Sequence, residues 1–218
     1  MKEPPVTSTE VVVKMETRKI IFLHGFFASG SCIPAQAFVQ YLKGKIQVLT
    51  PDLPLHPHEA LRFIHQLCEQ EKPDALVGNS NGSFLAQIEA TRSGIPALLG
   101  NPYFEMTKFL KERIGLHEYK SPRRDGKQQF IIDQKLIHEF EEVQLHQWDY
   151  YKESDRERIW GLFGENDQLA HYKPLFLTYY THAYSFPGAH TPTAEEVKDY
   201  YVPLVEKLIQ DFSTKSHH

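Results

Sequence analysis

The chain contains a G-x-S-x-G pentapeptide, Gly78-Asn79-Ser80-Asn81-Gly82, that is typical of a serine nucleophile. It follows an apolar run, Ala75–Val77, and precedes a helical pattern that extends to about Ser93. A sharp turn from strand to helix lifts the serine oxygen clear of the sheet, where it can attack an electrophile. The crowded backbone of such a turn admits only very small residues two positions before and after the serine, and both are glycine here. We therefore predict that Ser80 is a nucleophile.

Two further side chains stand where a base and an acid would be needed. A serine nucleophile requires a general base, and the base requires an acid that orients it. In a parallel α/β sheet, functional groups gather beyond the carboxyl ends of the strands. Asp167 follows the apolar run Ile159–Phe163, and His190 follows the next run, Ala183–Phe186. We predict that His190 is the base and that Asp167 is the acid.

Other residues compete for these roles, because the chain has 12 His. His24 follows an early apolar run, and we expect it to shape the first loop rather than to act as the base. His56 and His58 flank Pro57, and we expect both on the surface. Asp52 also follows a strand, but it precedes Ser80 in the chain, so a structural role in a turn is the better interpretation.

The oxyanion that forms during acyl transfer needs two backbone N–H donors. We expect one donor at Asn81, the residue after the nucleophile, where the N-terminus of a helix adds a partial positive charge. The second donor should lie in the loop after the first strand, Gly25-Phe26-Phe27. Phe26 is the favoured donor and Phe27 the alternative, and core packing is the competing interpretation of both phenyl rings.

Short apolar runs alternate with amphipathic stretches along the chain. Continuous apolar runs joined by helices are typical of a parallel sheet that is covered on both faces. We therefore predict an α/β fold with a doubly wound, mostly parallel sheet of about six strands. The expected strands are Ile20–Leu23, Ile46–Leu49, Ala75–Val77, Ile95–Leu99, Ile159–Phe163 and Ala183–Phe186, with a further edge strand at Val11–Val13. The last helix should open with a Thr193/Glu196 capping box and kink at Pro203.

The segment from residue 103 to 158 is too long for a simple strand connection. One helical stripe runs over Met106, Phe109, Leu110 and Ile114, and a second follows Asp133, an expected N-cap. We interpret residues 103–158 as a lid or cap inserted within a single domain of residues 1–218, with ordinary scaffold helices as the alternative. Basic residues within this segment predict a solvated loop; they are Lys120, Arg123, Arg124 and Lys127.

Length and charge narrow the class of protein. The chain has 218 residues, of which 41% are hydrophobic, so one well-packed domain is expected. The formal net charge of -4 argues against nucleic acid as the main partner. Cys32 and Cys68 lack the spacing of metal ligands, which favours free thiols in a reducing compartment. The N-terminal stretch has no apolar core of a signal peptide, and no run reaches membrane-spanning length, so we expect a cytoplasmic protein without a membrane partner.

Taken together, these residues resemble those of an α/β-hydrolase. The order Ser80, Asp167, His190 is the order of that fold. More narrowly, the chain is similar to the small bacterial esterases of the YqiA type, from about Lys19 to Phe212. The shared motifs are LHGF, DLPLHP, VGNSNGS, NPYFEM, QQFII, GAH and a final helix that carries tyrosines and a proline.

The resemblance implies an α/β-hydrolase fold with a small helical lid, and a hydrolase of carboxylic esters or thioesters that uses no metal or organic cofactor. Asn81 departs from the pattern, because an apolar or glutamine-like residue is commoner after the nucleophile. We expect this asparagine to make the acyl pocket more polar and short acyl chains to fit best. Other chemistry by the same three residues, such as C–C hydrolysis, perhydrolysis or lyase chemistry, is an alternative, as is a non-catalytic binding protein of the same shape. The oligomeric state stays open.

Overall fold

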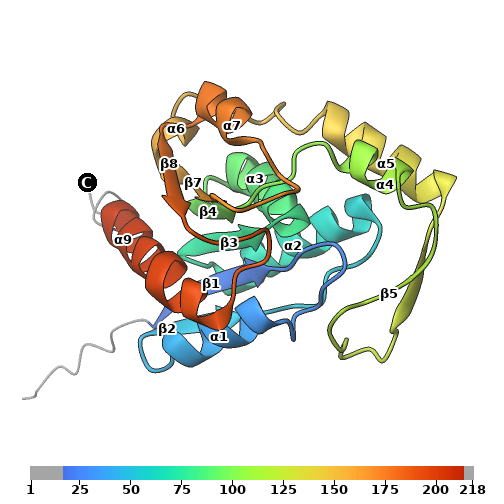
Figure 1. The fold of residues 1–218 in the computed structure, drawn as a ribbon. Coiled ribbons are helices and arrows are strands. Elements are labelled where there is room, and N and C mark those ends of the chain that lie inside the picture. Colours follow the sequence, from blue (N-terminus) through green and yellow to red (C-terminus); the bar gives the residue numbers. More distant parts are fainter. Residues whose placement is uncertain (1–16, 214–218) are drawn as a thin grey trace, which may run out of the picture.

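Six parallel strands form the centre of the protein in the computed structural model, which describes residues 17–213 (Figure 1). The strand order is β2-β1-β3-β4-β7-β8, so the chain winds outward from β1 to β2 and then crosses to the other side of β1. The strands are β1 (Arg18–Leu23), β2 (Ile46–Leu49), β3 (Ala75–Asn79), β4 (Ala97–Gly100), β7 (Ile159–Gly164) and β8 (His182–Phe186). The predicted sheet of six strands is therefore confirmed; the strand expected at Val11–Val13 lies outside the described residues.

Helices cover both faces of this sheet, because successive strand residues point to opposite sides. On one face, Phe22 and Val77 belong to a core with α1 (Ile33–Tyr41) and the C-terminal helix. On the other face, Ile21 and Leu76 belong to a core with α2 (Pro57–Glu71), α3 (Asn81–Ser93) and α7 (Lys173–Tyr179). Gly94 ends α3 in the left-handed conformation. No helix within residues 17–213 has both the length and the apolar character that crossing a membrane requires.

The C-terminal helix contains a π turn. It consists of α8 (Ala194–Glu196), the π turn η1 (Val197–Tyr201) and α9 (Val202–Ser213), and the predicted capping box closes its start. Pro203 is the second residue after the π turn. Proline lacks an N–H donor and clashes with the carbonyl one helical turn earlier, so the interruption falls where this conflict arises. The extra residue of the π turn rotates the face of α9 that packs on the sheet. The buried residues on this face are Val205, Leu208 and Ile209, and Leu204 is only partly buried.

We call residues 103–158 the cap segment. It holds α4 (Met106–Lys111), β5 (Gly115–Glu118), β6 (Gln129–Ile132), α5 (Gln134–Leu145) and α6 (Asp155–Arg158). The strands β5 and β6 pair antiparallel in a second sheet, separate from the main one, with β5 at the lower right of Figure 1. The sequence analysis did not foresee them. The Asp133 carboxylate caps α5 by accepting from the N–H of Leu136 at 2.8 Å. Ile114 does not join the stripe of α4, because the helix ends at Lys111 and leaves Ile114 55% exposed.

Candidate active site

Ser80 occupies the sharp turn between β3 and α3. Its backbone has φ 56 and ψ -120, a conformation that costs a residue with a side chain about 1–3 kcal/mol. The flanking glycines are required by contact: a Cβ at Gly82 would come 1.9 Å from the carbonyl oxygen of Leu23, and one at Gly78 would come 2.5 Å from the N–H of Ser83. The chain therefore holds Ser80 at the carboxyl end of a central strand, in the turn that the pentapeptide predicts.

The structure brings the three predicted side chains into one hydrogen-bonded chain. His190 Nε2 lies 2.7 Å from Ser80 Oγ, and His190 Nδ1 lies 2.8 Å from Asp167 Oδ2. Asp167 follows β7 and His190 follows β8, so neighbouring strands deliver both groups to one edge of the sheet. A carboxylate beside Nδ1 favours the tautomer with its proton there, which leaves the lone pair of Nε2 facing the serine hydroxyl.

Asp167 is held as a carboxylate by its surroundings. The residue is 3% exposed, and its Oδ1 accepts hydrogen bonds from the N–H groups of Leu169 at 2.7 Å and Ala170 at 3.1 Å. Burial by itself raises the pKa of the Asp167 carboxyl, but the hydrogen bond and charge of His190 and these N–H donors outweigh it, so the pKa lies below its usual value. A negative charge is thus available to orient the imidazole.

Asn101, which the sequence analysis missed, fixes the loop that carries His190. Its side-chain amide donates to the carbonyl oxygens of Ala189 at 2.9 Å and His190 at 3.0 Å. Its side-chain oxygen accepts from the N–H of Gly164 at 2.6 Å, so one buried side chain ties the end of β7 to this loop. Asn101 itself follows β4 with φ 41, in the left-handed region that asparagine tolerates better than most residues.

Asn79 supports the same loop from the strand before the nucleophile. Its amide donates to the carbonyl oxygen of His190 at 3.3 Å, and its oxygen accepts from the hydroxyl of Tyr201 at 3.4 Å. Both asparagines stand at the carboxyl ends of strands. The rule that selected Asp167 and His190 could therefore have found them, although nothing in the sequence shows that their partners are backbone carbonyls.

The loop after β1 runs beside Ser80. A Cβ at Gly25 would lie 3.6 Å from the Cβ of Ser80, and a hydrogen bond from Ala28 N–H to Gly25 oxygen closes the turn. Within residues 17–213, the N–H groups of Phe26 and Asn81 have no protein acceptor, so both predicted donors are free. The Asn81 side chain is buried and does not line the cavity beside Ser80, which corrects the expectation of a more polar acyl pocket.

His24 anchors this loop, and its ring bonds to backbone groups rather than to Ser80, Asp167 or His190. It is 3% exposed; its Nδ1–H donates to the carbonyl oxygen of Gly25 and its Nε2 accepts from the N–H of Leu53, both at 2.9 Å. Burial lowers the pKa of His24 to about 4, so it is neutral near pH 7. His56 and His58 pair instead with Glu139 and Glu142 of α5, at 2.6 Å and 3.1 Å, and thereby connect the start of α2 to the cap segment.

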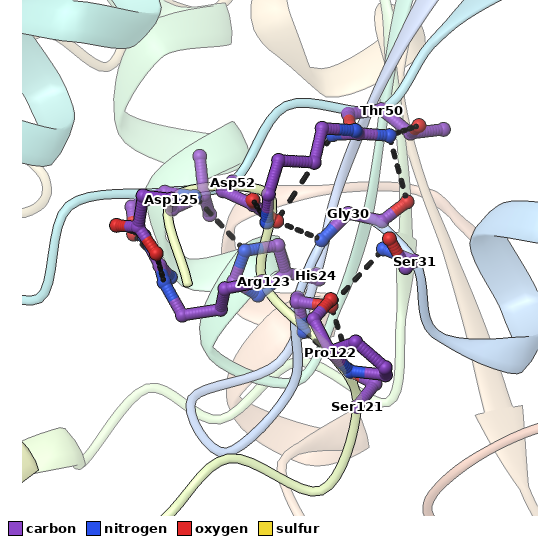
Figure 2. Close-up of polar contacts among 12 residues, drawn as sticks. His24, Gly30, Ser31, Thr50, Asp52, Ser121, Pro122, Arg123 and Asp125 are labelled. Carbon is purple, nitrogen blue, oxygen red and sulfur yellow. Dashed lines mark hydrogen bonds and ion pairs between the residues drawn. The ribbon is translucent and has the colours of Figure 1, made fainter. Parts of the chain in front are cut away.

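The basic loop of the cap segment is largely exposed, as its charges predict, but its two arginines also bond to the body of the domain. Arg123 lies against the loop that follows β2 (Figure 2), and Arg124 donates to the carbonyl oxygen of Gly30 in the loop that follows β1. The Arg123 guanidinium, 8% exposed, donates to the carbonyl oxygen of Leu53, and that of Arg124 donates to the carbonyl oxygen of Thr50. Asp52 accepts from the N–H of Gly30 at 2.7 Å and from that of Arg124 at 2.6 Å, which gives it the structural role expected.

A cavity of about 450 Å³ opens beside Ser80 and His190. This volume suits a small organic ligand. Its walls come from the loop after β1, the start of α1, the cap segment and the loop after β7, and they are largely apolar. Side chains that line it include Phe26, Phe27, Ile33, Phe109, Lys120 and Leu169. Among the described residues, no group of three or more His, Cys, Asp or Glu side chains is arranged to hold a metal ion.

Solved structures of similar shape define the class. An esterase domain from Rhodothermus marinus is 16% identical, with a TM-score of 0.64 over 91% of this chain and 89% of that one. The monoacylglycerol lipase of Paleococcus ferrophilus is 16% identical, with a TM-score of 0.62 over 88% and 94%. The α/β-hydrolase domain-containing protein 10 from mouse is 14% identical, with a TM-score of 0.56 over 92% and 91%. The chain therefore has the α/β-hydrolase fold that its motifs resemble.

The family follows from the sequence itself. The model of the uncharacterised protein family UPF0227 matches residues 19–186, and the chain belongs to this family. The family resemblance drawn from the motifs is thereby confirmed. No curated protein matches the chain significantly.

Proposed function

We propose that this protein is a serine hydrolase that cleaves carboxylic esters through an acyl-enzyme. The observation that carries the proposal is the hydrogen-bonded chain from Asp167 through His190 to Ser80, placed at the wall of an apolar cavity. The presence of an esterase domain and a monoacylglycerol lipase among proteins of similar shape supports it. Thioesters would react by the same steps and form a second substrate class.

In the proposed reaction, Ser80 Oγ attacks the carbonyl carbon while His190 Nε2 takes its proton. The Asp167 carboxylate stabilises the resulting imidazolium. The N–H groups of Phe26 and Asn81 donate to the oxyanion, with Phe27 as the alternative to Phe26. His190 then gives its proton to the leaving alcohol, and the acyl group remains on Ser80. Water, activated by the same imidazole, attacks the acyl-enzyme and restores the hydroxyl.

We further propose that the preferred acyl groups are short. The cavity is limited to about 450 Å³, and Phe109 of the cap segment forms part of its wall. Rings of Phe26 and Phe27 pack against Phe109 at centroid distances of 6.1 Å and 5.9 Å, so an aromatic wall bounds the cavity on this side. In this proposal the cap segment acts as a lid that sets substrate size.

The proposal is tested with a fluorophosphonate probe, which labels an activated serine. We expect stoichiometric labelling at Ser80, identified by mass spectrometry of the labelled peptide. Ser80→Ala should not be labelled and should lose roughly a millionfold in turnover of p-nitrophenyl butyrate while keeping its fold. Ser185→Ala, which removes an exposed serine on β8, is the matched control. A folded parent protein that stays unlabelled would support the non-catalytic binding protein instead.

A further inference from the structure

Lys120 brings a positive charge to a cavity whose other lining groups are apolar or neutral, His190 apart. Of the lining residues, Lys120 carries the one permanent charge within the described part of the chain. Its ammonium lies 5.8 Å from the centroid of the Phe27 ring, which also lines the cavity. The charge therefore stands next to an apolar wall, where the screening of an ion pair by water is weaker than in bulk solvent.

The backbone around Lys120 is fixed against the body of the domain. The N–H of Lys120 donates to the carbonyl oxygen of Phe27 at 2.8 Å. The next two residues are held by fully buried Ser29: its N–H donates to Ser121 Oγ at 2.9 Å and its hydroxyl to the Pro122 carbonyl oxygen at 2.7 Å. These bonds fix this stretch of the cap segment, although Lys120 itself is exposed.

The neighbouring arginines already have acidic or carbonyl partners within the protein, whereas the Lys120 ammonium has no acidic partner among residues 17–213. Arg124 is paired with Asp52 and bonded to backbone carbonyls, and Arg123 is bonded to Asp125 and to Leu53. Between residues 17 and 213, no carboxylate lies within ion-pair distance of the Lys120 ammonium. Of these three basic side chains in the loop of the cap segment, Lys120 is the one that lines the cavity and is available to a ligand.

We propose that Lys120 makes the site selective for esters that carry a carboxylate at the end of the group that fills the cavity. Such a substrate has an apolar middle for the phenyl rings and an anion for the ammonium. The inference rests on the proposed function, because the ester reacts at Ser80. Either the acyl part or the alcohol part could bear the carboxylate, and the two arms of the experiment separate them.

The first arm compares p-nitrophenyl hydrogen adipate with p-nitrophenyl hexanoate, two esters of equal acyl length that differ in a terminal carboxylate. The second arm compares 4-acetoxybenzoate with 4-acetoxybenzamide, in which the charge lies on the alcohol part. We expect the parent to favour the anionic ester of one pair by kcat/KM. Lys120→Met should lower that preference about tenfold, as one charge pair near a surface predicts, and Lys120→Arg should preserve it. The preference should also shrink as ionic strength rises.

Lys127→Met is the matched control, since it removes a lysine from the same loop that does not line the cavity. The preference of Lys127→Met for the anionic ester, measured by kcat/KM, should equal that of the parent. Equal preferences for the parent and Lys120→Met in both pairs would overturn the inference.

A binding measurement separates this result from a failure of the proposed function. In a titration followed by NMR, Ser80→Ala should bind the anionic ester more tightly than the neutral one in at least one of two pairs, monomethyl adipate with methyl hexanoate or 4-acetoxybenzoate with 4-acetoxybenzamide. The added Lys120→Met change should remove the difference. If the parent hydrolyses none of the esters, the proposed function fails, while this titration still decides whether Lys120 recognises the carboxylate. Equal affinities within both pairs would contradict that recognition.

Discussion

Asn101 joins three parts of the candidate site through one amide group, which makes it the residue whose replacement is most informative. Asn101→Asp keeps the shape of the side chain but turns an acceptor oxygen toward the carbonyl oxygens of Ala189 and His190. Repulsion there should displace the imidazole from Ser80. We expect kcat for p-nitrophenyl butyrate to fall about tenfold to a hundredfold, as misplacement of a general base predicts, with KM little changed.

The control is Asn166→Asp, an exposed asparagine whose amide bonds to Pro187 in the same region. It should change kcat by less than about twofold, since surface substitutions of this kind have small effects. Thermal unfolding of both variants shows whether the fold persists. If Asn101→Asp kept the kcat of the parent, the loop would not need this anchor.

His24 links acidity to the stability of the loop after β1. Its pKa is about 4 in the folded protein, below the ordinary value of 6.5, because burial disfavours the imidazolium. Between these two values the unfolded chain binds a proton that the folded protein excludes. Stability is therefore complete above pH 6.5 and falls as the pH decreases toward 4, by about 3 kcal/mol from this residue.

Urea unfolding of the parent and of His24→Gln, measured between pH 7 and pH 4, checks this expectation. Glutamine can still accept from the N–H of Leu53, but it does not titrate. The difference in unfolding free energy between the two proteins should shift in favour of His24→Gln as the pH falls. Parallel curves would show that His24 does not control the acid sensitivity.

Among the elements, α4 of the cap segment contributes to the wall of the cavity. Phe109 is 9% exposed and lines the space beside Ser80. Phe109→Leu should lengthen the cavity, so the best p-nitrophenyl ester should move from a short acyl chain toward a longer one by about two carbons. We expect a loss of about 1–2 kcal/mol in unfolding free energy, less than truncation to alanine would cost. The measurement is kcat/KM over a chain-length series from acetate to decanoate.

The control is Phe212→Leu, a partly buried phenylalanine packed on the opposite face of the sheet. It should leave the preferred chain length unchanged. A parent that hydrolyses decanoate best would refute the short-pocket proposal, and an unchanged optimum in Phe109→Leu would show that α4 does not limit the acyl group.

The elements differ in how well their sequences predict them. The strands and the turn at Ser80 were predictable because continuous apolar runs and glycine spacing are local signals. The pair β5–β6 was missed since each strand has four residues and its outward side chains, Leu116 and Ile131, are apolar. Helix α1 was also missed, because exposed Ile33 and Val39 blur its amphipathic pattern. The contacts of Arg123 and Arg124 were not predicted, because their partners are backbone carbonyl oxygens and no sequence pattern identifies such partners.

For the whole molecule, strand order explains why distant residues meet. Because β3 lies between β1 and β4, the loop after β1, the turn at Ser80 and Asn101 share one edge of the sheet. The C-terminal helix reaches this edge through Tyr201, whose hydroxyl bonds to Asn79 and would lie 2.4 Å from a Cβ at Gly100. Side chains more than a hundred residues apart thus meet at the candidate site. Its three predicted members could be predicted because each follows the end of a strand. The supporting bonds of Asn79 and Asn101 could not, because they depend on where distant loops lie in the fold.

The contact between Trp148 and Tyr179 gives the protein a built-in optical reporter. The two rings are stacked at a centroid distance of 3.9 Å with an interplanar angle of 2°, and they join the cap segment to α7. The chain has 2 Trp, and the other, Trp160, is buried in the sheet. In a Trp160→Phe background, the emission of the single indole should therefore change in wavelength and intensity whenever the cap segment separates from α7. Any separation of the cap segment from α7 on addition of an ester would then be followed in real time, without an attached dye.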